Sequence, residues 1–103
     1  MVRVLSTQEC DAWEKLLDKA YHDEIQAIIH QLKQSLDVGK PLGYPFFREK
    51  KFGKYRVYFL IYEELDAVLL VTISDKKAQP DTIERIKADI SKYLETIRSA
   101  LQR

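Results

Sequence analysis

The stretch REKKFGKYRVYFLIY (residues 48–62), with AVLLVTISDKK (residues 67–77) after it, decides the predicted fold of this chain. Its apolar runs are rich in Val, Ile, Leu, Tyr and Phe, and the polar tetrapeptide EELD separates them, a pattern typical of β-strands joined by short turns. We predict strands at about residues 46–52, 55–62 and 67–74. Gly53-Lys54 is the predicted tight turn between the first two strands, and the three strands form a meander.

The segment before these strands is predicted to be mostly helical. Residues 2–5 form a short candidate strand, and STQE at 6–9 has the form of a capping box that begins a helix running to about residue 20. A second helix follows a break at YHD (21–23) and ends near Gly39, a normal C-terminal stop. These two helices are expected to form a helical hairpin.

Two prolines and a glycine in KPLGYP (40–45) predict a connection between the helical hairpin and the strands. After the strands, Pro80 suits the first position of a last helix. The apolar residues of that helix recur at steps of three and four: Ile83, Ile86, Ile90, Leu94, Ile97 and Leu101. Such a helix is long for so small a sheet, so either part of the stripe awaits another protein or the whole stripe is buried.

The expected fold class is α+β. A small antiparallel sheet, made of the short N-terminal strand and the three-stranded meander, is packed by the helical hairpin and carries the long C-terminal helix. Apolar side chains point both ways along 55–62, as in a strand that is covered on both faces. The 103 residues suit one domain, 1–103, with a single core.

Composition predicts a cytoplasmic protein with no membrane segment. No apolar run approaches the roughly 20 residues that a membrane helix needs, and MVRVLS at the start does not form a secretory signal. Cys10 is the one cysteine, which excludes an internal disulfide framework and suits a reducing compartment.

The net charge of +1 hides a segregation of charge along the chain. Residues 40–58 hold six basic residues against Glu49 alone, whereas residues 7–37 and 59–75 each carry a net −4. A basic belt between acidic flanks predicts one surface that binds an anion.

Most familiar catalytic and metal-binding patterns are missing from the sequence. The three glycines are not clustered and form no phosphate loop, and no Ser or Cys lies in a recognisable nucleophile setting. His22 and His30 have no Cys or paired acid at ligand spacing, so neither a metal nor another cofactor is expected. The acidic EELD at 63–66 is interpreted as a charged hairpin tip.

Basic residues surround the first hairpin turn, and tyrosines are interleaved with them. We call Arg48, Lys50, Lys51, Lys54 and Arg56 the basic hairpin. Residues 48, 50, 54 and 56 share strand parity, which predicts, subject to the turn geometry, that several project from one sheet face. Lys76 and Lys77 would close the same concavity. Cations hold phosphates and aromatic rings stack on bases, so nucleic acid is the favoured ligand; the alternative is a solvated edge on which lysines discourage aggregation.

The order of a short strand, a helical hairpin, KPLG (40–43), GKYRVY (53–58) and ISDKK (73–77) resembles the RelE/ParE superfamily of type II toxin–antitoxin toxins. A glycine followed closely by Tyr-Arg, and a strand that ends in Ser and paired bases, carry most of this resemblance. In the RelE branch it implies a metal-independent ribonuclease that cuts mRNA in the ribosomal A site. The ribose 2′-hydroxyl attacks the adjacent phosphorus, while Arg and Lys orient the phosphate and stabilise charge.

The resemblance also implies roles for individual residues. Arg56 matches the arginine after the turn and would clamp a phosphate. Lys51 falls near the basic residues of the preceding strand, with Lys50 or Arg48 as alternatives, and Lys77 would stabilise the transition state. The expected RNA contacts are Arg48, Lys50, Lys54, Tyr55 and Lys76.

One position departs from the pattern: Ile83 stands where potent RelE nucleases carry a tyrosine, six residues after the basic pair. Two alternatives therefore stay open, a ParE-like inhibitor of DNA gyrase and a degenerate binding protein without catalysis. Under both toxin hypotheses, the ribonuclease and the gyrase inhibitor, the expected partner is a cognate antitoxin, with which the chain forms a hetero-oligomer. Under the ribonuclease hypothesis, the ribosome and mRNA are further expected partners.

Overall fold

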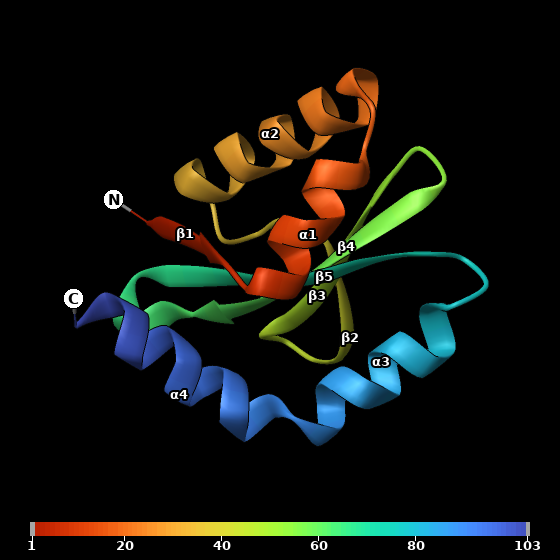
Figure 1. Cartoon of the computed structure of the whole chain (residues 1–103). Helices are drawn as coiled ribbons and strands as arrows, with labels where there is room; N and C mark the ends of the chain where they lie inside the picture. Colours follow the sequence, from red (N-terminus) through yellow and green to blue (C-terminus); the bar gives the residue numbers. More distant parts are fainter. Residues whose placement is uncertain (1, 103) are drawn as a thin grey trace.

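The computed structural model describes residues 2–102, which fold into one sheet with helices on both faces (Figure 1). In chain order the elements are β1 (Arg3–Ser6), α1 (Gln8–Leu16), α2 (Lys19–Gln34), β2 (Lys40–Tyr44), β3 (Phe47–Phe52), β4 (Tyr55–Tyr62), the 3₁₀ turn η1 (Glu63–Leu65), β5 (Ala67–Asp75), α3 (Gln79–Ala88) and α4 (Ile90–Leu101). The strand order is β1-β5-β4-β3-β2. The predicted α+β class, the helical hairpin and the meander β3-β4-β5 are confirmed.

Each face of the sheet has its own apolar layer. On the face covered by α1 and α2, which we call the α2 face, helix residues such as Ile25 and Leu32 pack on Val57 and Phe59. On the opposite face, the α3 face, α3 and α4 bring other side chains onto Tyr58, Leu60 and Leu69, among them Ile86 and Ile97. β4 and β5 are therefore buried on both sides, as the unbroken apolar runs predicted.

The sheet is mixed rather than wholly antiparallel. β1 pairs parallel with β5, with Val4 opposite Val68. Because the meander leaves β5 with a free edge, a strand from the other end of the chain can complete it, and α1 and α2 lie in the long connection that a parallel arrangement needs. The four residues of β1 have no sequence pattern that distinguishes a parallel strand from an antiparallel one.

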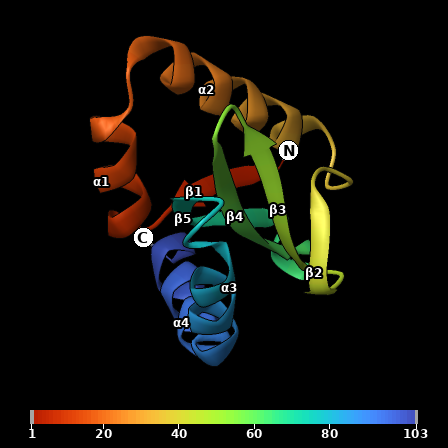
Figure 2. The same cartoon turned by 90° about the vertical axis from the view of Figure 1, so that its right-hand side faces the viewer.

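The prediction that residues 40–45 form only a connection was wrong. Lys40–Tyr44 forms β2, an edge strand paired with β3, and Figure 2 shows it in yellow at that edge of the sheet. Pro41 is tolerated there because an edge strand does not need every amide hydrogen. The pairing is irregular between Pro41 and Tyr44.

The predicted long C-terminal helix is divided at Asp89, whose backbone is not helical. The division lets α3 and α4 follow the sheet at different angles (Figure 1). Ile86 and Ile97 are fully buried, while Ile83 and Leu94 are half-buried on the same layer. The apolar stripe is therefore neither wholly buried nor largely exposed, an outcome between the two alternatives that the sequence left open.

The helix starts near the N-terminus also differ from prediction. Thr7, not Ser6, caps α1, because its side-chain oxygen accepts the Cys10 amide at 3.0 Å. Asp18 caps α2, so the break between the helices precedes residues 21–23. Burial raises the pKa of the Cys10 thiol to about 12, which keeps it protonated at neutral pH. None of the helices within residues 2–102 is long and apolar enough to cross a bilayer.

Candidate active site

The register of the β3–β4 hairpin brings two cations together. Gly53-Lys54 forms a two-residue turn, so Phe52 pairs with Tyr55 and Lys51 pairs with Arg56. Directly opposed residues of antiparallel strands point to the same face and lie close together. Lys51 and Arg56 therefore stand side by side on the α3 face, beyond the apolar layer.

The same register separates the rest of the basic hairpin from this pair. Lys50 pairs with Val57, and Arg48 pairs with Phe59, so both side chains lie on the α2 face. The prediction from shared parity was wrong, because a two-residue turn places an odd-numbered residue opposite an even-numbered one.

Arg48 is engaged in holding the fold. Its Nε donates to the Pro45 carbonyl oxygen at 2.9 Å, and its Nη1 donates to Asp37 Oδ1 at 3.3 Å. The side chain is only 17% exposed. These bonds tie the loop before β2 to the turn before β3, so Arg48 has little capacity left for RNA.

Tyr55 and Lys54 lie at the tip of the hairpin. The Tyr55 ring makes edge contacts with Trp13 and Tyr21, at centroid distances of 5.8 and 5.1 Å, which anchors the tip to α1 and α2. Lys54 Nζ lies 5.4 Å from the Tyr55 ring centroid, within cation–π range. Tyr55 is half-buried, and its ring is used in packing against the two helices.

Glu49 lies on the α3 face, next to the pair of Lys51 and Arg56. It stands opposite Lys40 on one side and Tyr58 on the other, so a row of residues crosses three strands next to the pair of Lys51 and Arg56. Its side chain is 8% exposed, and Gln79 Nε2, from the first residue of α3, lies 2.8 Å from each carboxylate oxygen. An open hollow of about 400 Å³ borders these groups; it is lined by Gly39, Lys40, Glu49, Lys50, Lys51 and Arg56.

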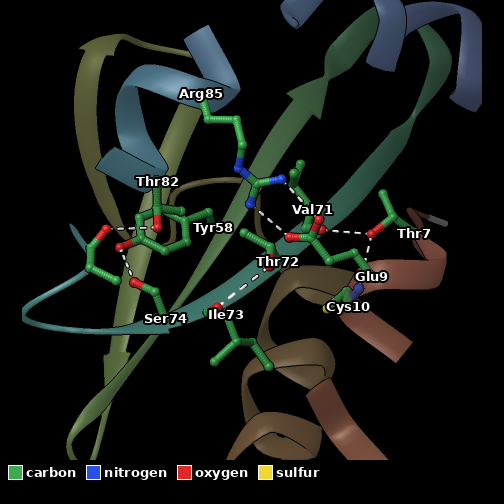
Figure 3. A network of polar contacts seen from close by, with 11 residues as sticks. Thr7, Glu9, Cys10, Tyr58, Val71, Thr72, Ile73, Ser74, Thr82 and Arg85 are labelled. Atoms are coloured by element: carbon green, nitrogen blue, oxygen red, sulfur yellow. Dashed lines mark hydrogen bonds and ion pairs between the residues drawn. The ribbon is translucent and has the colours of Figure 1, made fainter. Parts of the chain in front are cut away.

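A buried hydroxyl pair supports the site from β4 and β5. The Tyr58 hydroxyl lies 2.8 Å from Ser74 Oγ (Figure 3). Ser74 Oγ also donates to the Asp75 carbonyl oxygen. Burial raises the pKa of Tyr58, and the hydrogen bond with Ser74 opposes part of that rise. The phenol is therefore neutral at pH 7. Because Ser74 pairs with Arg56 across the strands, this contact fixes the sheet beneath the guanidinium.

A bidentate ion pair fixes α3 relative to α1. Arg85 donates to both carboxylate oxygens of Glu9, at 2.9 and 2.7 Å, as Figure 3 shows. These hydrogen bonds hold the pKa of Glu9 below its usual value. The pair connects α3, whose first residue Gln79 contacts Glu49, to α1.

The two cations of the pair are not used by the fold. Across residues 2–102, neither the Lys51 ammonium nor the Arg56 guanidinium makes a hydrogen bond or an ion pair with another side chain or the backbone. Lys76 and Lys77 lie exposed on the turn between β5 and α3, close in sequence to Gln79. Two cations held side by side, with their hydrogen-bond donors unused by the protein, can bind a phosphate.

Ile83 is part of the apolar layer on the α3 face. It brings no hydroxyl to the site. In the part of the chain from 2 to 102, no group of three His, Cys, Asp or Glu side chains is placed to hold a metal ion.

Sequence reasoning missed Glu49, Gln79 and Ser74. Two features of the sequence could have indicated Glu49. It is the single acid within the basic belt, and a two-residue turn places odd-numbered residues of β3 on the same face as Arg56. Gln79 carried no signal, because its contact with Glu49 spans 30 positions of sequence.

Comparison with solved structures identifies the architecture. The isolated RelE toxin of E. coli superposes with a TM-score of 0.66 at 13% identity, over 84% of this chain and 99% of that one. The chain has the fold of the RelE toxins. The RelB–RelE complex of Methanococcus jannaschii gives a TM-score of 0.61 at 18% identity, covering 76% and 96%. The RelBE2 complex of Mycobacterium tuberculosis gives 0.56 at 22% identity, covering 74% and 94%. No protein-family model and no curated sequence matches the chain.

Proposed function

We propose that this RelE-fold chain is the toxin of a type II toxin–antitoxin system and acts as a ribosome-dependent mRNA endoribonuclease in the cytoplasm. The observation that carries the proposal is the pair of Lys51 and Arg56, which stand side by side on the α3 face and make no hydrogen bond or ion pair within residues 2–102. Folding gains nothing evident from holding two free cations together, whereas a phosphodiester gains charge stabilisation.

The chemistry follows from these groups. The Arg56 guanidinium can bind two non-bridging phosphate oxygens at once, and Lys51 adds a second positive charge from the neighbouring strand. Lys77, on the turn that leads into α3, would approach the same phosphate as charge develops on it. Attack by the ribose 2′-hydroxyl then needs in-line positioning and stabilisation of charge, which these cations provide.

We further propose a cognate antitoxin as partner. Two of the similar structures described above are complexes of a RelE toxin with a RelB antitoxin. A segment carrying acidic side chains would complement the hollow beside Lys40, Lys51 and Arg56. In the resulting hetero-oligomer the antitoxin would cover the cations that otherwise bind mRNA.

The test is induced expression in a bacterial host, comparing the wild type, Arg56→Ala and the control Arg98→Ala, in which an exposed arginine of α4 is removed. We expect the wild type and the control to stop growth and to produce cuts within translated codons, and Arg56→Ala to do neither. Growth arrest with intact mRNA and lost supercoiling would favour a gyrase inhibitor instead. No effect at verified expression would contradict toxicity.

A further inference from the structure

Glu49 is the one acidic residue among the described residues that line the hollow beside Lys51 and Arg56. At 8% exposure its carboxylate has lost most of its hydration, which is costly for a charged group. A carboxylate buried only to stabilise a fold is normally paired with a cation. Here its hydrogen bonds come from the neutral amide of Gln79, although Lys51 stands on the same face and strand.

The contact with Gln79 leaves the carboxylate able to accept a further hydrogen bond. An ionised carboxylate has about four lone-pair sites, and Gln79 Nε2 takes one on each oxygen. The carboxylate is thus held from the side of α3 while it borders the hollow. This is the arrangement of an oriented proton acceptor.

We infer that Glu49 is the general base that takes the proton of the attacking 2′-hydroxyl, and that Gln79 is its positioning residue. The inference rests on the proposed ribonuclease function and adds to it the proton acceptor. The lysines suit this role less well, because an ammonium group has three donors and no acceptor. Their place is on the phosphate.

The step balances as follows. The 2′-O–H bond breaks and its proton passes to a Glu49 oxygen, while the 2′-oxygen forms a bond to phosphorus. The bond from phosphorus to the 5′-oxygen breaks, and that oxygen leaves with the bonding electron pair and takes a proton from water. The products are a 2′,3′-cyclic phosphate and a 5′-hydroxyl. No oxidant, reductant or metal is required for this balance.

Charged and titratable side chains from three strands surround the Glu49 carboxylate. The titratable or charged groups that face it are Lys40 on β2, Lys51 on its own strand, and Tyr58 and Arg56 on β4. The adjoining residue of α3 is the uncharged Gln79. Tyr58 is neutral at pH 7, so it places no charge beside the carboxylate.

The experiment measures single-turnover cleavage of mRNA on programmed 70S ribosomes by the full chain, over a range of pH. The variants are Glu49→Gln, which keeps the shape and an acceptor for Gln79, Glu49→Asp, and Gln79→Leu. Glu63→Gln, an exposed glutamate on η1 at the far end of β4, is the matched control. A second measurement is binding of an mRNA with a 2′-deoxynucleotide at the cleavage position, which cannot react.

We expect Glu49→Gln to lower the rate by about 100-fold or more, as loss of a general base does, and to remove the acid limb of the profile. Glu49→Asp retains that limb at a reduced rate. Binding of the deoxy-substituted mRNA to Glu49→Gln is unchanged or tighter, because a negative charge near the phosphate is gone. Gln79→Leu lowers the maximal single-turnover rate constant more than it changes the toxin concentration that gives half of that rate, and Glu63→Gln behaves as the wild type.

The outcomes separate the two proposals. Absence of cleavage by the wild type would overturn both the ribonuclease function and the inference. Wild-type cleavage together with an equally active Glu49→Gln, its acid limb intact, would overturn the inference alone. Loss of cleavage that is matched by lost mRNA binding and lower melting temperatures in both Glu49 variants would assign a structural role to Glu49.

Discussion

Two arginines of the basic hairpin should respond to alanine substitution in opposite ways. Arg48→Ala removes the hydrogen bond from Nε to the Pro45 oxygen and the pair with Asp37. A hydrogen bond from a charged donor contributes about 1.5–3 kcal/mol. The Asp37 side chain is 96% exposed, so that ion pair adds only a few tenths of a kcal/mol. The expected loss in the free energy of unfolding is therefore about 2 kcal/mol.

Arg56→Ala loses no hydrogen bond or ion pair within residues 2–102, and it removes a cation beside Lys51. Its effect on the free energy of unfolding should stay within about 0.5 kcal/mol. For a domain of this size, about 2 kcal/mol corresponds to a fall in Tm of about 10 °C. We therefore expect Arg48→Ala to melt about 10 °C below the wild type and Arg56→Ala to melt close to it, with the reverse order of damage to mRNA cleavage.

The assay is thermal unfolding by circular dichroism, beside cleavage of ribosome-bound mRNA at a temperature where all three proteins are folded. The reasoning would be refuted if Arg48→Ala kept the wild-type Tm and lost cleavage. A fall in Tm for Arg56→Ala as large as that for Arg48→Ala would also refute it, since Arg56 would then be part of the fold.

Three further predictions concern the framework of the site. Gly53→Ala should lower the free energy of unfolding by about 1–2 kcal/mol or more in urea titration, because φ is +58° there and the added Cβ would collide with the Tyr21 ring; an unchanged midpoint would contradict the turn geometry. Ile97→Ala should cost about 3 kcal/mol in the same titration, because this fully buried side chain joins α4 to the sheet; a loss below about 1 kcal/mol would indicate that α4 is loosely held. The pKa of Glu9 is lowered from 4.5 in the folded state, so its pairing with Arg85 stabilises the protein above about pH 4.5 and is lost as the pH falls below that value. Tm measured from pH 7 to pH 3 should fall less steeply for Glu9→Gln than for the wild type, and parallel curves would show that this pair does not contribute.

Several features of the β3–β4 hairpin could be predicted from local sequence patterns alone. The composition of 55–62 was enough to predict a strand buried on both faces, because apolar residues at both parities leave no polar side for solvent. Gly53 marked the turn, since a left-handed φ favours glycine. The basic belt and the order of motifs led to the RelE fold. These features depend on residues that are neighbours along the chain.

The remaining features depend on residues that are far apart in sequence. Whether Arg48 or Lys51 shares a face with Arg56 was decided by the register of the turn, which inverts parity across the hairpin. The parallel pairing of β1 with β5 and the addition of β2 at the other edge depend on which edges the meander leaves free.

The sequence by itself determined the fold class, the two-sided burial of the central strands and the presence of a basic hairpin, because periodicity and turn chemistry are local. Only the tertiary structure decided which cations are free and which are used by the fold. It also placed Gln79 against Glu49, a contact across 30 positions that requires α3 to pack on the finished sheet. Side-chain roles at this site follow from register and helix docking, and these are set by packing between segments that no local pattern connects.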